Sequence, residues 1–102
     1  VLNIKKIFFK KSKDISNRDV ESILETKYFD SDWYMKKYAD VANSKMLPIE
    51  HYMKYGWKEG RKPSEEFDGE LYYNKNPDVK NSGLNPLYHY VKFGIEEKRL
   101  IR

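Results

Sequence analysis

The hydrophobic and polar positions of this chain follow a helical spacing over most of its length. Within residues 29–64, apolar side chains recur three or four positions apart at Tyr34, Tyr38 and Val41. This spacing places them on one face of an α-helix. No segment shows the alternation of apolar and polar residues that is typical of a β-strand. The pattern therefore predicts an all-α protein, a compact array of short helices.

A repeat organises these helices. Residues 29–64 align without a gap with residues 67–102, a shift of 38 positions (67 − 29), and 15 of the 36 aligned residues are identical. A repeat of this length is typical of stacked supersecondary units. The sequence thus predicts two tandem copies of one helix–turn–helix. The positions assigned a structural role in the repeat are Asp30, Tyr34, His51, Tyr52, Gly56 and Arg61 in the first copy and Asp68, Tyr72, His89, Tyr90, Gly94 and Arg99 in the second.

The first helix of each copy has a recognisable start. Asp30 is a favourable N-cap, and Phe29 and Tyr34 on either side of it form the pattern of a hydrophobic staple. The second copy has the same arrangement. There, Asn76-Pro77 is expected to break the first helix, after which the chain restarts as a short turn, because proline disfavours helix at the residue before it. The first copy lacks this proline and predicts one continuous helix.

A second helix follows in each copy. Pro48 and Pro86 suit its first position, where a missing N–H costs nothing. Asn85 is a favourable cap before Pro86. We expect Gly56 and Gly94 to end the helix in the left-handed conformation that favours glycine after a helix.

An additional helix is predicted before the repeats. Ser16-Asn17-Arg18-Asp19 is typical of a helix start, and apolar residues continue at helical spacing as far as Tyr28. Because two repeats are fewer than the roughly three that a stable array needs, we expect this helix to pack on the first copy. Residues 16–102 then form one domain, preceded by a basic segment at residues 1–15.

Composition and charge narrow the class of protein. The chain has 102 residues, a net charge of +4 and no cysteine, which excludes disulfides and thiolate metal sites. It has no apolar run long enough to span a membrane and no secretory signal. We expect a cytoplasmic location, and the inner face of the membrane is a more specific alternative. Val1 in place of an initiator methionine suggests either a fragment of a larger parent protein or a non-standard start codon. The aromatic fraction is 16%, and these residues must supply much of the core.

The basic excess lies mainly at the N-terminus, where residues 1–13 hold five lysines and no acid. Two interpretations stay open. The segment is a flexible tail, as chain ends often are, or it is a basic amphipathic segment that lies on an anionic membrane surface. The residues that would contact such a surface are Lys5, Lys6, Phe8, Phe9, Lys10 and Lys11.

The shared motifs resemble those of a known repeat. Both copies contain F-D-x-x-x-Y, then D-V, then P-x-x-H-Y, then G-x-x-E-x-R. This combination resembles a short repeat found beside the catalytic domain of bacterial glycosyltransferases of surface-polysaccharide synthesis. Similar repeats also occur in some large secreted bacterial proteins. The resemblance covers roughly residues 20–102 and implies a helical accessory module. Three positions depart from the family pattern: Ala39 stands in place of a proline, and Lys45 and Lys98 in place of glycines.

The two histidines are the first candidates for chemistry. His51 and His89 would be metal ligands or general bases, or they make a structural hydrogen bond at the edge of the second helix. We favour the structural interpretation, because a catalytic base is seldom needed twice and no cysteine or carboxylate follows at chelating spacing. No catalytic residue, metal or cofactor is therefore predicted. The Asp30-Ser31-Asp32 run is typical of a helix start rather than of a nucleotide-sugar site.

The charged and aromatic repeat positions have similar alternatives. Arg61 and Arg99, together with Glu59 and Glu97, could bind an anion. We expect them instead to brace the turn after Gly56 and Gly94, by pairing with a helix cap or with Asp40 and Asp78 of the next layer. The tryptophans and tyrosines could stack on sugar rings, although most lie at core spacing. Trp57 is the aromatic residue expected to be exposed. Nucleic acid is not expected as a partner, since no nucleic-acid-binding motif is present.

The leading hypothesis is a non-catalytic accessory module of a surface-polysaccharide glycosyltransferase. Its partner would be another protein or its own catalytic domain, with the anionic membrane surface as a further contact of residues 1–13. Two alternatives remain. One is a carbohydrate-binding module that holds the polysaccharide, which an exposed row of aromatic residues would favour. The other is a fragment of an enzyme whose active site lies outside this chain.

Overall fold

The chain folds into short helices, as the helical spacing predicts. The computed structural model describes residues 15–102, and within that range it contains seven α-helices, two π-helical turns and no β-strand. An isolated bridge between Ser64 and Phe67 is the one strand-like contact among these residues. The prediction of an all-α protein is confirmed. The predicted membrane contacts of residues 1–13 lie outside the described residues.

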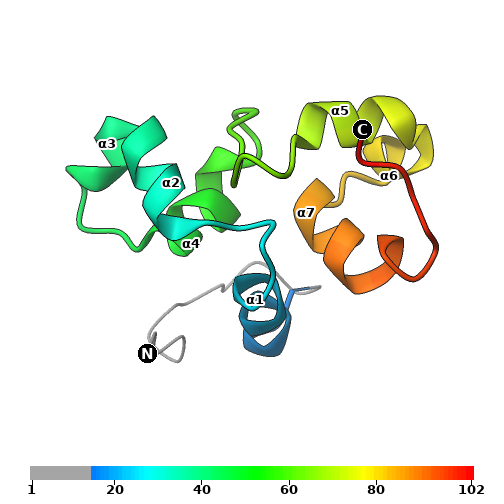
Figure 1. The fold of residues 1–102 in the computed structure, drawn as a ribbon, viewed down its shortest axis with the longest axis horizontal. Coiled ribbons are helices and arrows are strands. Elements are labelled where there is room, and N and C mark those ends of the chain that lie inside the picture. Colours follow the sequence, from blue (N-terminus) through cyan, green and yellow to red (C-terminus); the bar gives the residue numbers. More distant parts are fainter. Residues whose placement is uncertain (1–14) are drawn as a thin grey trace.

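The two copies contain the same order of elements and lie beside one another along the long axis of the molecule (Figure 1). The first copy consists of α2 (Ser31–Lys37), α3 (Ala39–Ala42), α4 (Pro48–His51) and the π-helical turn η2 (Tyr52–Gly56). The second copy consists of α5 (Gly69–Lys75), α6 (Pro77–Ser82), α7 (Pro86–His89) and the π-helical turn η3 (Tyr90–Gly94).

The predicted helix starts are confirmed by their hydrogen bonds. The Asp30 carboxylate accepts a hydrogen bond from the N–H of Trp33 at 3.0 Å, and Asp68 and Asn85 cap α5 and α7 in the same way. The staple also forms, with the ring centroids of Phe29 and Tyr34 5.7 Å apart. The residues of a cap or a staple are a few positions apart in sequence, so these helix starts can form without long-range contacts.

The first helix breaks in both copies, and this corrects the prediction of a continuous helix in the first. The break falls at Tyr38 and at the equivalent Asn76. Each of these side chains binds the end of its own copy: the Tyr38 hydroxyl accepts from the N–H of Lys62 at 2.8 Å, and the Asn76 amide donates to the carbonyl of Leu100 at 3.2 Å. The first copy therefore breaks at this point without a proline. In both copies the side chain at the break bonds the last residues of its copy, at Lys62 or Leu100.

Helix α1 (Asn17–Leu24) starts as predicted but docks elsewhere. A reciprocal pair of hydrogen bonds between Ser16 and Asp19 caps it. It ends before Tyr28, which the sequence pattern had included. The helix packs on α7 and η3 of the second copy, with Asp19 paired to Lys92 at 3.4 Å. The expectation that it packs on the first copy is wrong.

The reason lies in the segment that joins α1 to the first copy. Tyr28 packs edge-on against Tyr90, with ring centroids 5.1 Å apart, and also contacts Phe67. Burying this ring against the second copy draws α1 to the same side. A sequence pattern marks α1 as amphipathic but does not say which neighbour covers its apolar face.

The core that results is rich in aromatic rings. Its tyrosines and phenylalanines meet at tilted or edge-to-face angles, which the ring quadrupole favours. The buried apolar residues are Val20, Ile23, Phe29, Tyr34, Val41, Ile49, Tyr52, Met53, Phe67, Tyr72, Val79, Leu87, Tyr88 and Tyr90. Both copies contribute to one continuous cluster.

Candidate functional site

The shared residues of the repeat gather around one buried tyrosine–histidine pair in each copy. The hydroxyl of Tyr34, on α2, lies 2.8 Å from Nδ1 of His51 at the end of α4. Tyr72 and His89 repeat this contact at the same distance. The pair joins the first helix of a copy to its second, so the predicted structural hydrogen bond of each histidine is confirmed.

The glycines of the repeat have a different role from the one predicted. Gly56 and Gly94 do not adopt a left-handed conformation, since among glycines of the described chain only Gly60 and Gly83 have positive φ. Instead, a Cβ at Gly56 would collide with the hydroxyl of Tyr34, and a Cβ at Gly94 would collide with that of Tyr72. Glycine is needed because a buried phenol passes directly over the helix backbone.

An arginine near the end of each copy pairs with two carboxylates of the same copy. Arg61 forms a bidentate pair with Asp40, at 2.9 and 2.8 Å, and its Nε donates to Glu59 at 2.9 Å. The predicted partner is confirmed, but it belongs to the same copy and not to the next layer. Bidentate pairing fixes the direction of the guanidinium plane as well as its position.

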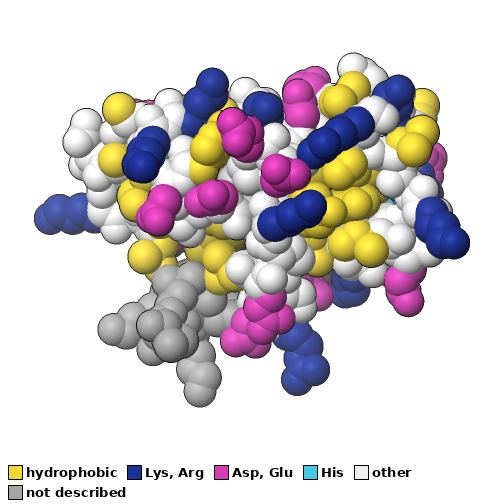
Figure 2. Space-filling model, in the orientation of Figure 1, with side chains coloured by type: hydrophobic (Ala, Val, Ile, Leu, Met, Phe, Trp, Pro, Cys, Tyr) yellow, Lys and Arg dark blue, Asp and Glu magenta, His cyan; other side chains and the backbone are white. Residues whose placement is uncertain are grey.

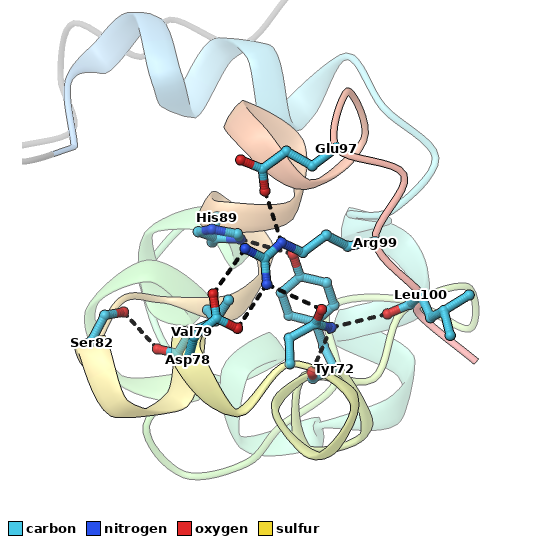
Figure 3. Close-up of polar contacts among 9 residues, drawn as sticks. Tyr72, Asp78, Val79, Ser82, His89, Glu97, Arg99 and Leu100 are labelled. Atoms are coloured by element: carbon cyan, nitrogen blue, oxygen red, sulfur yellow. Dashed lines mark hydrogen bonds and ion pairs between the residues drawn. The ribbon is translucent and has the colours of Figure 1, made fainter.

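The second copy repeats the arrangement with Arg99. Figure 3 shows the guanidinium of Arg99 reaching across Tyr72, with Glu97 on one side and Asp78 on the other. Both distances are 2.8 Å. The hydrogen bond with arginine holds the pKa of Asp78, like that of Asp40, below its usual value.

The turn before each arginine keeps its shape despite a substitution. Gly60 has φ 77°, and Lys98 at the equivalent position has φ 55°. A lysine in this left-handed region is strained. The replacement of glycine at Lys98 therefore leaves the turn intact at an energetic cost, which the four side-chain hydrogen bonds of Arg99 help to offset.

Burial keeps the central groups of each copy neutral. It raises the pKa of the Tyr72 hydroxyl to about 12 and raises that of Tyr34 as well. It also lowers the pKa of His51 and of His89, and the nearby arginine lowers each further. At neutral pH the protonated phenol and the neutral imidazole therefore join the two helices of each copy without burying a charge.

The remaining predicted positions lie in the core, and sequence reasoning missed several contacts. Tyr52 and Tyr90 are buried, as expected. The bridging position of Tyr28 and the buried amide of Asn76 were not predicted. Asn76 occupies the position of Tyr38 in the first copy, and a polar group is present at both positions. The sequence does not show that this position lies beside the last residues of its copy, so the role of Asn76 could not be predicted.

The exposed aromatic positions also differ from the prediction. Trp57 is partly buried against the core, and its indole N–H donates to the carbonyl of Met53 at 3.0 Å. Among the residues that the structure describes, the exposed aromatic ones are instead Tyr55, 51% exposed, and Phe93, 41% exposed. They occupy equivalent positions of the two copies.

The surface has open grooves and charges of both signs. In the view of Figure 2, acidic and basic side chains are interspersed and apolar side chains gather over the second copy. The groove beside the start of α2 has a volume of about 460 Å³ and is lined by Trp33 and the carboxylates of Asp30 and Asp32, among others. Within residues 15–102, no group of three histidines or carboxylates is placed to hold a metal ion.

Comparison with known proteins gives no relative. No protein-family model, curated protein or solved structure matches the chain. The fold and site define a helical protein in which two equivalent clusters brace two copies of one unit. Among the described helices, none is both long and apolar enough to cross a bilayer.

Proposed function

We propose that this chain is a non-catalytic accessory module of a bacterial glycosyltransferase of surface-polysaccharide synthesis. Its role would be to hold the catalytic domain or a protein partner in position at the cytoplasmic side of the membrane. The motifs of the two copies, which resemble the repeat of such enzymes, supply the link to that context.

One observation carries the non-catalytic part of this proposal. The polar residues that the two copies share are engaged with one another inside each copy, as in the pairs of Tyr34 with His51 and of Arg61 with Asp40. Side chains held in this way give each copy a fixed shape, which is a structural role. A rigid helical surface is suited to positioning a partner.

A turnover assay tests this part directly. The purified chain is incubated with UDP-glucose, UDP-galactose and UDP-N-acetylglucosamine, and release of UDP is measured. We expect no release above buffer. Release that disappears in the Asp32→Asn variant would contradict the proposal and restore Asp30-Ser31-Asp32 as a nucleotide-sugar site.

The docking role has its own test. A photo-crosslinking amino acid is placed at the exposed Leu100, 64% exposed, and cross-linked products from cells are identified by mass spectrometry. The expected product is a glycosyltransferase catalytic domain, in the same polypeptide or in another. Cross-links confined to proteins without such a domain would refute the docking role.

The basic N-terminal segment supports a membrane-proximal location. Five lysines within residues 1–13 would each contribute on the order of 1 kcal/mol to binding an anionic surface. We expect the chain to co-sediment with phosphatidylglycerol vesicles and to dissociate in high salt. A variant lacking residues 1–13 should stay in the supernatant. Equal binding by the two proteins would exclude this segment as the anchor.

A further inference from the structure

One exposed aromatic ring occurs at the same place in each copy. Tyr55 and Phe93 occupy equivalent positions on the π-helical turns, η2 and η3, and they are 51% and 41% exposed to solvent. The residue type changes between the copies but the ring does not. What the two positions share is therefore a flat apolar surface, and the hydroxyl is dispensable.

Each ring lies beside a fixed imidazole. The ring centroids of Tyr55 and His51 are 5.8 Å apart, and those of Phe93 and His89 are 5.5 Å apart. Nδ1 of each histidine is occupied by a buried tyrosine hydroxyl. The other ring nitrogen, Nε2, has no protein partner, and within the described chain the one fully buried unpaired side-chain polar atom is the Tyr52 hydroxyl. Nε2 therefore reaches solvent beside the exposed ring.

Fixed carboxylates complete the surroundings. The backbone N–H of Glu59 donates to the carbonyl of Tyr55 at 3.3 Å, and that of Glu97 donates to the carbonyl of Phe93 at 3.1 Å. In each copy the same arginine joins this glutamate to an aspartate, Asp40 or Asp78. Both carboxylates of each copy are more than half exposed while Arg61 or Arg99 holds them in place. Each copy thus presents a flat ring, an imidazole nitrogen and two oriented carboxylates.

We propose that Tyr55 and Phe93 are stacking platforms for the pyranose rings of a glycan, one platform in each copy. A pyranose has an apolar face of C–H groups and a rim of hydroxyls. The face suits an exposed aromatic ring, and the rim suits a few positioned polar groups around it. An anchor for another protein would instead be surrounded by apolar residues that exclude water. This inference is independent of the accessory role, because it rests on the exposed side chains and not on the resemblance.

The two platforms are unequal. The ammonium group of Lys92 lies 5.8 Å from the ring centroid of Phe93, and Tyr88 packs edge-on against the same ring. Lys92 and Tyr88 therefore cover part of the Phe93 ring. Tyr55, whose ring neighbour is His51, is the more open platform. A polymer that reaches both platforms would gain from bivalent binding.

The test is an array of purified bacterial surface polysaccharides probed with the full chain, followed by titration of a retained polysaccharide against the variants. We expect Tyr55→Ala to weaken binding roughly tenfold and Phe93→Ala to weaken it less. Tyr55→Phe should bind as the parent does, because the ring remains. Tyr55→Leu, which keeps apolar bulk without a flat ring, should lose as much as Tyr55→Ala.

Matched controls separate stacking from general hydrophobicity and from misfolding. Leu47 and Leu100 are also exposed, at 36% and 64%, and their replacement by alanine should leave binding unchanged. Urea unfolding of each variant reports whether the fold is intact. Retention of no polysaccharide on the array overturns the proposal, as does equal binding by the Tyr55→Ala/Phe93→Ala double variant.

Discussion

The two copies of the repeat have the same internal bonds but different neighbours. The hydroxyl–imidazole distance is 2.8 Å in both, and both arginines make a bidentate pair with an aspartate of their own copy. The tyrosine at the start of each π-helical turn differs. The Tyr90 ring packs edge-on against the Tyr28 ring, whereas the hydroxyl of Tyr52 is buried without a partner among the described residues.

This difference shows which parts of the repeat are autonomous. Bonds that link residues within one copy recur because the same sequence recreates them. Contacts that depend on a neighbouring segment do not recur, since the Tyr28 ring and α1 pack against the second copy. Each copy of this repeat therefore keeps the same internal hydrogen bonds, while its contacts with neighbouring segments differ.

The largest effects are expected at the two glycines. Gly56→Ala and Gly94→Ala each force a Cβ into a buried phenol, and overpacking of this kind should lower the free energy of unfolding by about 3 kcal/mol. Urea denaturation measures the loss. Gly83→Ala is the control, because a Cβ there meets open space and only its φ of 76° opposes the change. It should cost about 1 kcal/mol.

A double variant sharpens this comparison between the copies. With Tyr34→Phe, the nearest remaining atoms to a Cβ at Gly56 lie at 3.4 Å, so the cost of Gly56→Ala should fall by more than half. In the second copy Tyr72→Phe should rescue less, because a Cβ at Gly94 also meets the Tyr90 ring at 2.9 Å. Equal rescue in both copies would contradict the packing described here.

These glycines also show how far the sequence alone could go. The caps at Asp30 and Asn85 were predictable because a cap and its helix are adjacent in sequence. The pairing of Arg61 with Asp40 was predictable from charge and repetition. The role of Gly56 was not, because its requirement comes from a tyrosine on another helix. For the same reason, the exposed position of Tyr55 could not be distinguished from that of Trp57.

The next largest effect is expected at the tyrosine–histidine pairs. Tyr34→Phe and Tyr72→Phe each leave a buried imidazole nitrogen without its partner, which should lower the free energy of unfolding by about 1–2 kcal/mol. Because both contacts are internal to a copy, the two losses should be equal. Thermal and urea unfolding compare them. Losses that differ by more than the error would show that the copies are not equivalent.

Stability should also depend on pH through these histidines. The pKa of His51 and of His89 is lowered in the folded protein from its usual 6.5, so the unfolded chain binds protons more readily. The free energy of unfolding is therefore greatest above about pH 6.5 and falls as the pH decreases through the folded pKa values. The loss should be smaller than in the Tyr→Phe variants, because a protonated imidazole can still donate to the phenol oxygen.

Two variants assign this pH dependence. His51→Asn and His89→Asn remove the titrating group, and each should flatten about half of the slope measured by urea unfolding between about pH 7 and pH 5. Asp40 and Asp78 contribute only at lower pH, since their pKa is held below the usual 3.8. A slope that persists in the double variant would locate the proton uptake elsewhere.

The smallest effect is expected at Tyr52 and Tyr90, the tyrosines that begin the two π-helical turns, and it should occur in one copy only. Removing the unpaired hydroxyl in Tyr52→Phe relieves a desolvated group and should raise the free energy of unfolding by about 1 kcal/mol. The Tyr90 hydroxyl is not among the buried unpaired atoms of the described chain, so Tyr90→Phe should bring no such gain. Tyr28→Phe keeps the ring that packs against Tyr90 and serves as the matched control. Urea unfolding compares the three variants. An equal gain in Tyr90→Phe, or a loss in Tyr52→Phe, would mean that the two buried hydroxyls have equivalent surroundings, and the proposed dependence of each copy on its neighbour would fail at this position.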